Sequence, residues 1–398
     1  MSPQPIITRL DINRFRGLNA LSLDNLSHVN VLVGANNCGK TSILETIMLL
    51  GAPMSFRTVV EMALSRVSPG REQEKKNRIA YVLSMFQHEK DKKYLIDLGA
   101  VANNFWYGYK IEAERDKRLL TYRIDERTHL LATKLWVENM PLGAPSCAHE
   151  WGIIWSTGIA NGGNYDFSQS YIQNYDGNYH DEDDSGNQSV WDDGSMGYYK
   201  HYPLQFGDLC NPFFFPASKV NYHRLTANFV VRLLQDGKKT DLLKVLRIFE
   251  PDIEDVNVVE GEVYLSQDHR PVRMMPLYTY GYGLQKAAAL VTATINMEDS
   301  VLLVDEIENA IHMSAFEEVF GWFLEACLQY RVQAFLTTHS AEALDAILRV
   351  AHDRFSDRDI LRAITLRKDQ EANITRKIIR TGEEAYEDRE RFEEELRV

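Results

Sequence analysis

Residues Gly34 to Thr41 read Gly-Ala-Asn-Asn-Cys-Gly-Lys-Thr, the phosphate-loop (Walker A) pattern of two glycines flanking four residues, followed by Lys and Thr. In this pattern, backbone N–H groups of the loop and of the following helix point at phosphate oxygens. Lys40 reaches the β- and γ-phosphates, and the Thr41 hydroxyl is offered to Mg²⁺. The predicted phosphate contacts are Gly34, Ala35, Asn36, Asn37, Cys38, Gly39, Lys40, Thr41 and Ser42.

The residues on both sides of the loop support this prediction. Val29 to Val33 is a short apolar, β-branched run that is typical of a buried strand. Ser42 to Leu50 has the pattern of a helix. A strand, the loop and a helix therefore follow one another in the order that a phosphate loop requires. An ordinary glycine turn is the alternative, and this context argues against it.

The composition is that of a globular protein with room for two or three domains. The chain has 398 residues, of which 44% are hydrophobic and 25% are charged. It has no uninterrupted apolar stretch of about 18 residues, and Met1 to Pro5 lacks the pattern of a signal peptide. We therefore expect a cytoplasmic protein without membrane contacts. The scattered cysteines indicate neither a zinc site nor a disulfide framework.

The net charge of −13 is concentrated in two segments. Residues 150–199 hold nine acidic residues and no Lys or Arg, and residues 381–398 hold eight acidic and three basic residues. These segments carry −9 and −5, so the other residues carry about +1. The acidic total is thus compatible with a local basic face. Residues 57–93, with nine basic and five acidic residues, are the candidate for a DNA-binding surface, and a solvated face is the alternative.

We expect an α/β protein with a split head, in which a mixed or parallel sheet is formed by residues 1–50 and 213–398. A lid or β lobe would occupy residues 51–149, and an acidic, aromatic-rich insertion would occupy residues 150–212. The insertion contains the acidic run Asp181 to Asp184. Contiguous carboxylates among Gly, Asn and Ser favour a solvated loop over a metal site. The aromatic residues around them favour contact with a partner protein.

A second motif is the apolar run Val301 to Val304, which is typical of a buried parallel strand and ends at Asp305 and Glu306. This is the Walker B arrangement. We expect Asp305 to hold Mg²⁺ through water, and Glu306 to orient and deprotonate the attacking water. A strand that merely ends in surface acids is the alternative, and the phosphate loop argues against it.

Two further stretches lie near the second motif. Tyr280 to Lys286 reads Tyr-Gly-Tyr-Gly-Leu-Gln-Lys and opens a helix, where glycines at the N-terminus can form an anion site. Gln333 to Thr338 predicts a short strand that ends at His339, with Ser340 as the N-cap of the next helix. Each of these two stretches is a weak indication when taken alone.

Four motifs in this order resemble the heads of the SMC, RecF and OLD families of ABC-type ATPases. The strand predicted over Ile6 to Phe15, followed by Arg16 and Gly17, adds to the resemblance. The stretch Ile307 to His312 is most similar to OLD-like ATPases, including ATPase subunits of anti-phage systems such as PARIS, Septu and retron-linked operons. The resemblance implies that ATP and Mg²⁺ are the cofactors and that the activity is ATP hydrolysis.

The resemblance also implies roles for residues outside the two Walker motifs. Gly281 and Gly283 would bind the γ-phosphate of ATP held by the opposite subunit, and His339 would hydrogen-bond the γ-phosphate in its own subunit. A glutamine at a strand end, placed by position at Gln87, would contact Mg²⁺ and the attacking water. SMC-type signature loops usually have Ser where Gly281 stands, so this chain departs from their pattern at that position.

The catalytic set implied by the resemblance is Lys40, Glu306 and His339, and the metal set is Thr41, Asp305 and Gln87. We expect a homodimer or higher homo-oligomer that closes on ATP and controls a separate effector protein. The stretch Glu308 to His312 would cross the dimer interface.

Many OLD proteins carry a Toprim nuclease built on a Glu and an Asp-x-Asp pair. Asp357 to Asp359 matches the pair, but it stands at an apparent helix start with little chain after it, so we expect any nuclease to be a separate protein. One alternative is a RecF-like or SMC-like repair ATPase that binds DNA directly. The other is a scaffold that binds ATP with little turnover.

Overall fold

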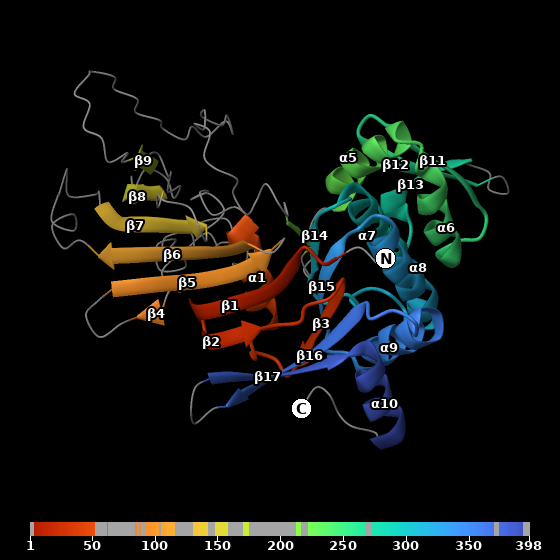
Figure 1. Cartoon of the computed structure of the whole chain (residues 1–398). Helices are drawn as coiled ribbons and strands as arrows, with labels where there is room; N and C mark the ends of the chain where they lie inside the picture. The colour runs from red at the N-terminus through yellow and green to blue at the C-terminus, as the bar shows by residue number, and fades with distance from the viewer. Residues whose placement is uncertain are drawn as a thin grey trace. The chain divides into compact units, whose positions relative to one another are not determined.

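The structure, a computed structural model, forms two compact units (Figure 1). The head unit comprises Met1–Thr8, Leu23–Leu44 and Cys210–Val398, and the sheet unit comprises Arg9–Ser22 and Glu45–Leu209. The structure describes residues 4–51, 62, 84–85, 87–88, 93–102, 105–115, 130–141, 148–157, 170–174, 212–215, 222–267, 273–369 and 374–392.

The centre of the head unit is a six-stranded sheet. In spatial order its strands are β10 (Phe213–Phe215), β14 (Val301–Val304), β15 (Gln333–Thr337), β3 (Val29–Gly34), β16 (Leu361–Asp369) and β17 (Ile374–Thr381). The first five are parallel, and β17 pairs with β16 in the antiparallel direction. The carboxyl ends of β3, β14 and β15 therefore meet at one edge, where α/β sheets bind their ligands.

Every residue of β3, β14 and β15 is buried. Strands that are mostly apolar and buried along their whole length are typical of parallel sheets covered on both faces. The strands predicted over Val29 to Val33 and Val301 to Val304 are therefore confirmed. The α/β class and the largely parallel sheet are confirmed as well.

Helices accompany the strands of the head unit. They are α5 (Tyr222–Gln235), α6 (Lys239–Phe249), α7 (Tyr282–Asn296), α8 (Phe316–Gln329), α9 (Ala341–Phe355) and α10 (Gly382–Phe392), with α1 (Lys40–Gly51) after the phosphate loop and short turns η2 (Leu277–Thr279) and η3 (Met313–Ala315). Helix α7 is buried throughout Leu284–Ile295 and packs against α5, α6 and α8. Ser340 caps α9 as predicted, because its side chain accepts from the Ala343 N–H at 3.0 Å.

The end of α9 corrects one prediction. The helix ends at Phe355, so Asp357 and Asp359 follow a helix end and precede β16. The prediction of a helix start there was wrong. An apolar face that repeats at helical spacing as far as Phe355 explains the length of the helix.

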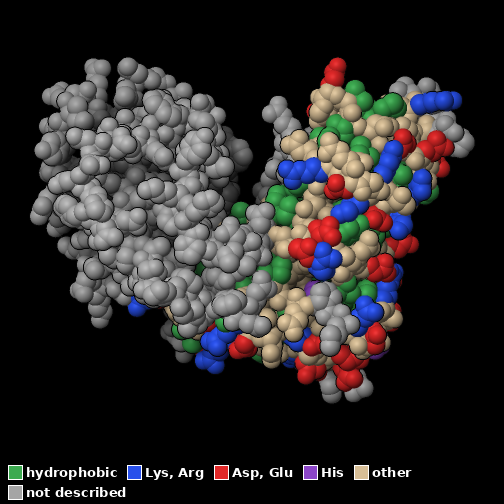
Figure 2. All heavy atoms as spheres, turned by 45° about the horizontal axis from the view of Figure 1, so that its top comes forward, with side chains coloured by type: hydrophobic (Ala, Val, Ile, Leu, Met, Phe, Trp, Pro, Cys, Tyr) green, Lys and Arg blue, Asp and Glu red, His purple; other side chains and the backbone are tan. Residues whose placement is uncertain are grey.

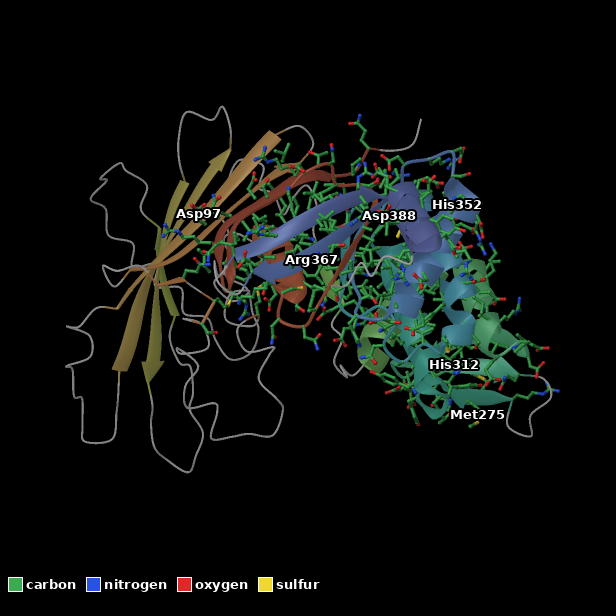
Figure 3. The ribbon with its side chains drawn as sticks, turned by 90° about the horizontal axis from the view of Figure 1, so that it is seen from below. Asp97, Met275, His312, His352, Arg367 and Asp388 are labelled. Atoms are coloured by element: carbon green, nitrogen blue, oxygen red, sulfur yellow. The ribbon has the colours of Figure 1, made fainter. Side chains whose placement is uncertain are left out.

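Side-chain pairs attach α10 to its neighbours. In one of them, Arg380 of β17 donates to Asp388 of α10 at 2.6 Å, and Figure 3 labels Asp388.

A small antiparallel sheet leads into α7. It consists of β11 (Ile253–Val259), β12 (Glu262–Gln267) and β13 (Met274–Pro276). Strands β11 and β12 form a hairpin, and its turn has positive φ at both Glu260 and Gly261, which matches the right-handed twist of the strands. Strand β13 continues directly through η2 to the start of α7.

The sheet unit is built on an eight-stranded sheet. Its order is β2 (Leu18–Leu23), β1 (Ile7–Phe15), β5 (Lys93–Ala102), β6 (Phe105–Arg115), β7 (Leu130–Pro141), β8 (Ala148–Thr157) and β9 (Ser170–Asn174), with β4 (Gln87–His88) paired to β5. Residues 9–22 belong here because β1 pairs with β5, whereas sequence analysis placed them in the head. The run Asp181 to Asp184 and most of residues 57–93 lie outside the described residues.

Candidate functional site

The phosphate loop begins at the end of β3 in a backbone conformation that requires glycine. Gly34 has φ +144°, and a Cβ on it would lie 2.3 Å from the Leu366 carbonyl oxygen of β16. Gly39 has φ +105°. Both values lie in the region that favours glycine. The two glycines of the motif are therefore explained by the fold of the head unit itself.

The other residues of the loop divide by exposure. Ala35, Asn36 and Asn37 are exposed, whereas Cys38 and Ser42 are buried. Burial raises the pKa of the Cys38 thiol, so this side chain is a small apolar group in the loop.

Lys40 begins α1, and its Nζ donates to the Gly34 carbonyl at 2.6 Å and to the Ala35 carbonyl at 3.1 Å. These bonds hold the ammonium group against the loop. The fold thus places the predicted phosphate-binding cation on the predicted cradle.

Thr41 and Asp305 meet although 264 positions separate them in the chain. The Thr41 hydroxyl lies 3.1 Å from Oδ1 and 3.2 Å from Oδ2 of Asp305. Thr337, at the end of β15, donates from its hydroxyl to Asp305 Oδ1 at 2.6 Å. A hydroxyl and a carboxylate are the hard oxygen ligands that Mg²⁺ prefers. The donor set of this pair therefore fits Mg²⁺.

Glu306 follows directly with φ +50°, which is uncommon for a residue other than glycine and is often associated with function. The Thr337 hydroxyl accepts its N–H at 2.8 Å. The side chain of Glu306 is 42% exposed, and its Oε1 lies 3.9 Å from His339 Nδ1. The backbone of Glu306 is therefore held by the neighbouring strand end while its carboxylate remains accessible to solvent.

Glu308 holds His339 in place. Its Oε1 accepts the N–H groups of His339 at 3.0 Å and Ser340 at 3.3 Å, and it lies 2.9 Å from His339 Nδ1. The Glu308 side chain is only 8% exposed, whereas that of His339 is 55% exposed. Sequence analysis missed this positioning role. The available signal was an acidic residue three positions after Asp305, close enough to reach the next strand end.

The predicted signature loop, Tyr280 to Gly283, leads into the first turn of α7, with Gly281 as the N-cap. Gln285 supports the loop, because its Nε2 donates to the Tyr280 carbonyl at 2.8 Å. A Cβ on Gly283 would lie 2.8 Å from the Ala310 carbonyl oxygen, whereas one on Gly281 would meet nothing within 4 Å. The two glycines predicted to bind phosphate are thus in different surroundings.

Lys286 is a second residue that sequence analysis did not assign. It is 1% exposed, and its Nζ donates to the carbonyls of Glu306 at 2.8 Å and Ile307 at 3.2 Å. Burial lowers the pKa of Lys286 to about 8, and the carboxylates of Glu308, Glu306 and Asp305 partly oppose this shift. The signal in the sequence was that Lys286 is the one charged residue of helix α7.

Gln87 lies in the sheet unit. Its Nε2 donates to the carbonyls of Leu18 at 2.6 Å and Arg16 at 3.1 Å, so its amide group closes the turn between β1 and β2. Its predicted contact with Mg²⁺ stays a prediction.

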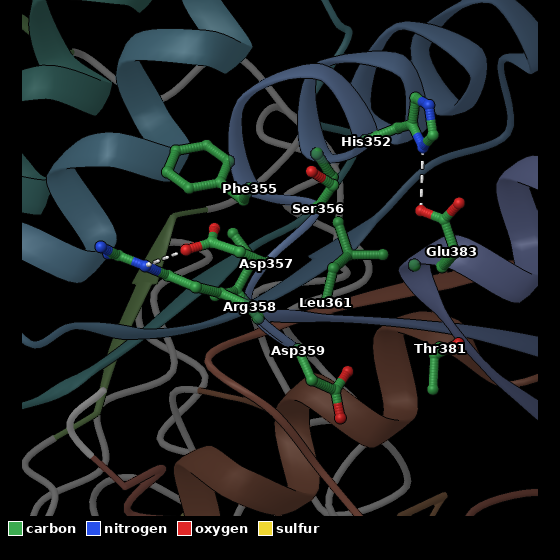
Figure 4. A pocket seen from close by; sticks show the side chains of 12 residues that line it. His352, Phe355, Ser356, Asp357, Arg358, Asp359, Leu361, Thr381 and Glu383 are labelled. Atoms are coloured by element: carbon green, nitrogen blue, oxygen red, sulfur yellow. Dashed lines mark hydrogen bonds and ion pairs between the residues drawn. The ribbon is translucent and has the colours of Figure 1, made fainter. Parts of the chain in front are cut away.

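A pocket of about 340 Å³ lies elsewhere in the head unit, between the end of α9 and the start of α10 (Figure 4). His352 Nδ1 lies 2.8 Å from Glu383 on one side of it, and Asp357 pairs with Arg358 on the other. Asp359 pairs with Arg362. Across the described residues, no group of three or more His, Cys, Asp or Glu side chains is arranged to hold a metal.

Two family models match the chain. The "AAA ATPase domain" matches residues 6–195, and the "AAA domain, putative AbiEii toxin, Type IV TA system" matches residues 184–345. Each covers less than half of the chain, and together they extend across both Walker motifs. The chain is therefore similar to AAA-type ATPases.

Curated relatives match over a short stretch. The DNA replication and repair protein RecF of Nitrosococcus oceani is 50% identical over 66 residues, which are 17% of this chain and 18% of that protein. RecF of Acinetobacter baylyi is 54% identical over 52 residues, which are 13% and 14% of the two chains. The chain thus matches less than a fifth of the length of these relatives.

Two solved structures are similar over most of the chain. One is the SMC head bound to the C-winged helix domain of ScpA, which is 10% identical to this chain. The match covers 96% of this chain and 100% of the SMC head chain, with a TM-score of 0.47. The other is the SMC head domain from Thermotoga maritima, which is also 10% identical. That match covers 94% of this chain and 98% of the other chain, with a TM-score of 0.39.

None of the helices in the described part of the chain has the length and apolarity needed to span a membrane.

Proposed function

We propose that this protein is an ABC-type ATPase head that binds ATP with Mg²⁺ at the phosphate loop and hydrolyses it. The observation that carries the proposal is the contact between Thr41 and Asp305, which joins the phosphate loop to the end of β14. Glu306 and His339 stand at the same edge of the sheet, so groups for metal binding, proton transfer and phosphate contact are gathered in one place.

Each residue then has one task in hydrolysis. Bound Mg²⁺ would neutralise charge on the β- and γ-phosphate oxygens. Lys40 adds a second positive charge next to the phosphates. Glu306 takes a proton from the attacking water, and His339 hydrogen-bonds a γ-phosphate oxygen. Glu308 keeps the His339 ring in place through its contacts with the backbone and Nδ1.

A second copy of the chain completes the site in this proposal. Gly281 caps α7, and the N–H groups at a helix N-terminus bind anions. The space around Gly281 leaves room for a phosphate to approach the backbone. ATP would therefore be held between the phosphate loop of one subunit and the signature loop of the other, as a homodimer or within a higher homo-oligomer.

The wider role that we infer is control of a separate effector protein in the cytoplasm, as part of anti-phage defence. Two features support it. The stretch Ile307 to His312 has the pattern of OLD-like ATPases. The model that matches residues 184–345 is described as a putative toxin of a type IV toxin–antitoxin system.

A repair ATPase that binds DNA directly is the second candidate, and the local identity to RecF favours it. On the face drawn in Figure 2, basic and acidic side chains of the described residues are interspersed. DNA affinity that falls steeply with salt would support direct DNA binding, because phosphate contacts release counterions. Its absence alongside robust ATPase activity would favour the effector role.

The test of the ATPase is the Glu306→Gln variant. It should keep ATP binding, because Lys40, Thr41 and Asp305 are unchanged, and lose about 10² or more in kcat because the water has no base. Binding is measured with a fluorescent ATP analogue and turnover by phosphate release. Glu318→Gln, an exposed acid on α8, is the matched control and should behave as the wild type.

Hydrolysis by Glu306→Gln at the wild-type rate would remove Glu306 from its role. A wild-type protein that binds ATP but releases no phosphate, alone or with DNA, would instead identify an ATP-binding scaffold.

A further inference from the structure

We propose that Lys286 is a positioning residue that holds the catalytic Glu306 of its own subunit from the helix that carries the signature loop. This inference rests on the proposed ATPase function. It assigns to α7 a task in the site of its own subunit, in addition to the phosphate contact that its N-terminus would make with the second copy.

The first support is the surroundings of the ammonium group. Lys286 is 1% exposed, and burying a charged amine is costly unless hydrogen bonds compensate. Its Nζ donates to the carbonyls of Glu306 at 2.8 Å and Ile307 at 3.2 Å. Met or Leu would fill the same space on an apolar helix without this cost. The side chain is therefore directed at the backbone that follows the Walker B strand.

The second support is the conformation of Glu306. Its φ of +50° places the backbone in the left-handed region, which a glutamate adopts only when its surroundings enforce it. The Thr337 hydroxyl accepts the N–H of Glu306 at 2.8 Å, and Lys286 donates to its carbonyl. The residue is thus held on both sides of its Cα, so the direction of its carboxylate depends on both contacts.

The third support is the way α7 meets the loop after Glu306. Gly283, in the first turn of the helix, lies so close to Ala310 that a Cβ would be 2.8 Å from the Ala310 carbonyl oxygen. Lys286 makes the second contact one turn further along. The loop from Glu306 to Ala310 is therefore supported at both ends by the first two turns of α7.

The first experiment compares Lys286→Met with the wild type. Loss of the contact should lower kcat by about 10², because a catalytic group displaced by about 1 Å can cost that much, while ATP binding stays within about threefold. Lys244→Met, an exposed lysine on α6, is the matched control and should leave both quantities unchanged. Thermal unfolding checks the fold, and Lys286→Gln replaces Lys286→Met if the latter does not fold.

The second experiment asks which subunit the lesion affects. Lys286→Met is mixed in equal amounts with Gly281→Asp, which lacks a functional signature loop, or with Glu306→Gln, which lacks the base. If Lys286 acts on its own Glu306, the first mixture contains heterodimers with one intact site and should recover up to about a quarter of wild-type activity. The second mixture should stay at the level of Lys286→Met.

If Lys286 instead supported only the signature loop, the pattern would reverse, because its lesion would fall in the site of the other subunit. That reversal would overturn the inference, as would wild-type kcat in Lys286→Met. Recovery in neither mixture would overturn it as well when Lys40→Ala and Gly281→Asp do complement each other. A mixture of Lys40→Ala and Gly281→Asp tests the shared site separately. If this pair does not complement and ATP does not dimerise the wild type, the proposed composite site fails, and only the kcat comparison then bears on Lys286.

Discussion

The phosphate loop and the signature loop both place glycine before a helix, but for different reasons. A Cβ on Gly34 would collide with the Leu366 carbonyl at 2.3 Å, and its φ of +144° excludes most side chains. Gly281 has φ −55°, and a Cβ there would meet nothing within 4 Å. The fold of the head unit explains the first glycine and does not explain the second. Under our proposal, the missing side chain at 281 makes room for the phosphate held by another copy.

Gly283 lies between these two cases. Its backbone conformation is helical, but the Ala310 carbonyl leaves no room for a Cβ. A substitution at 283 would therefore disturb its own subunit as well as any phosphate contact. Gly281 is the better position at which to test the contact from the opposite subunit.

The comparison is tested most strongly by Gly34→Ala. The new Cβ would collide with backbone in a strained conformation, so we expect a loss of about 3 kcal/mol or more in the free energy of unfolding and loss of ATP binding. Gly281→Ala, measured in the same denaturant titrations, should stay within about 0.5 kcal/mol of the wild type. Equal destabilisation of the two variants would contradict the distinction between the loops.

Gly281 should matter for turnover although it matters little for stability. Gly281→Asp introduces a negative charge where the γ-phosphate of the second copy would lie, so we expect kcat to fall by about 10² while the fold and ATP binding in the same subunit remain. ATP-induced dimerisation, followed by light scattering, should be lost as well. Wild-type turnover together with ATP-induced dimerisation in this variant would leave Gly281 without a role in the site.

The burial of Lys286 behind the Glu306 backbone can be tested through pH. Because burial lowers the pKa of Lys286 to about 8 from its ordinary 10.5, the unfolded chain keeps a proton between these values that the folded chain has released. Stability from this group therefore rises with pH from about 8 to 10.5. Relative to Lys286→Met, the wild type should gain on the order of 1–3 kcal/mol between pH 7.5 and pH 10. A difference that does not change with pH would show that Lys286 titrates normally.

The smallest effect is expected at the pocket beside α10, which serves as a reference region remote in sequence from both loops. The hydrogen bond to Glu383 raises the pKa of His352. Its stabilisation is therefore present below about pH 6.5 and is lost as the pH rises through the raised value. Relative to His352→Gln, the wild type should be more stable at pH 5.5 than at pH 8.5 by less than about 1 kcal/mol, because the pair is exposed. ATPase activity should not change.

Local patterns predicted much of the head unit. The glycine spacing of the phosphate loop, the apolar run before Asp305 and the helical periodicities each depend on neighbours in the chain, so they could be read directly. The assignment of residues 9–22 to a sheet with β5 and the end of the helix before Asp357 could not be read in this way. The pairing of β1 with β5 joins segments far apart in the chain, and the end of α9 depends on where its packed face ends.

The amino-acid sequence by itself determined which residues form the phosphate loop and the Walker B acids, because strand, turn and helix propensities act over a few residues. Only the tertiary structure decided which of them meet. Strand β15 lies between β14 and β3, and this order brings Thr337 to Asp305 and His339 to Glu308. The path of α7 likewise brings Lys286 to the Glu306 carbonyl. Such contacts depend on strand order and helix packing between distant segments, which no local periodicity encodes.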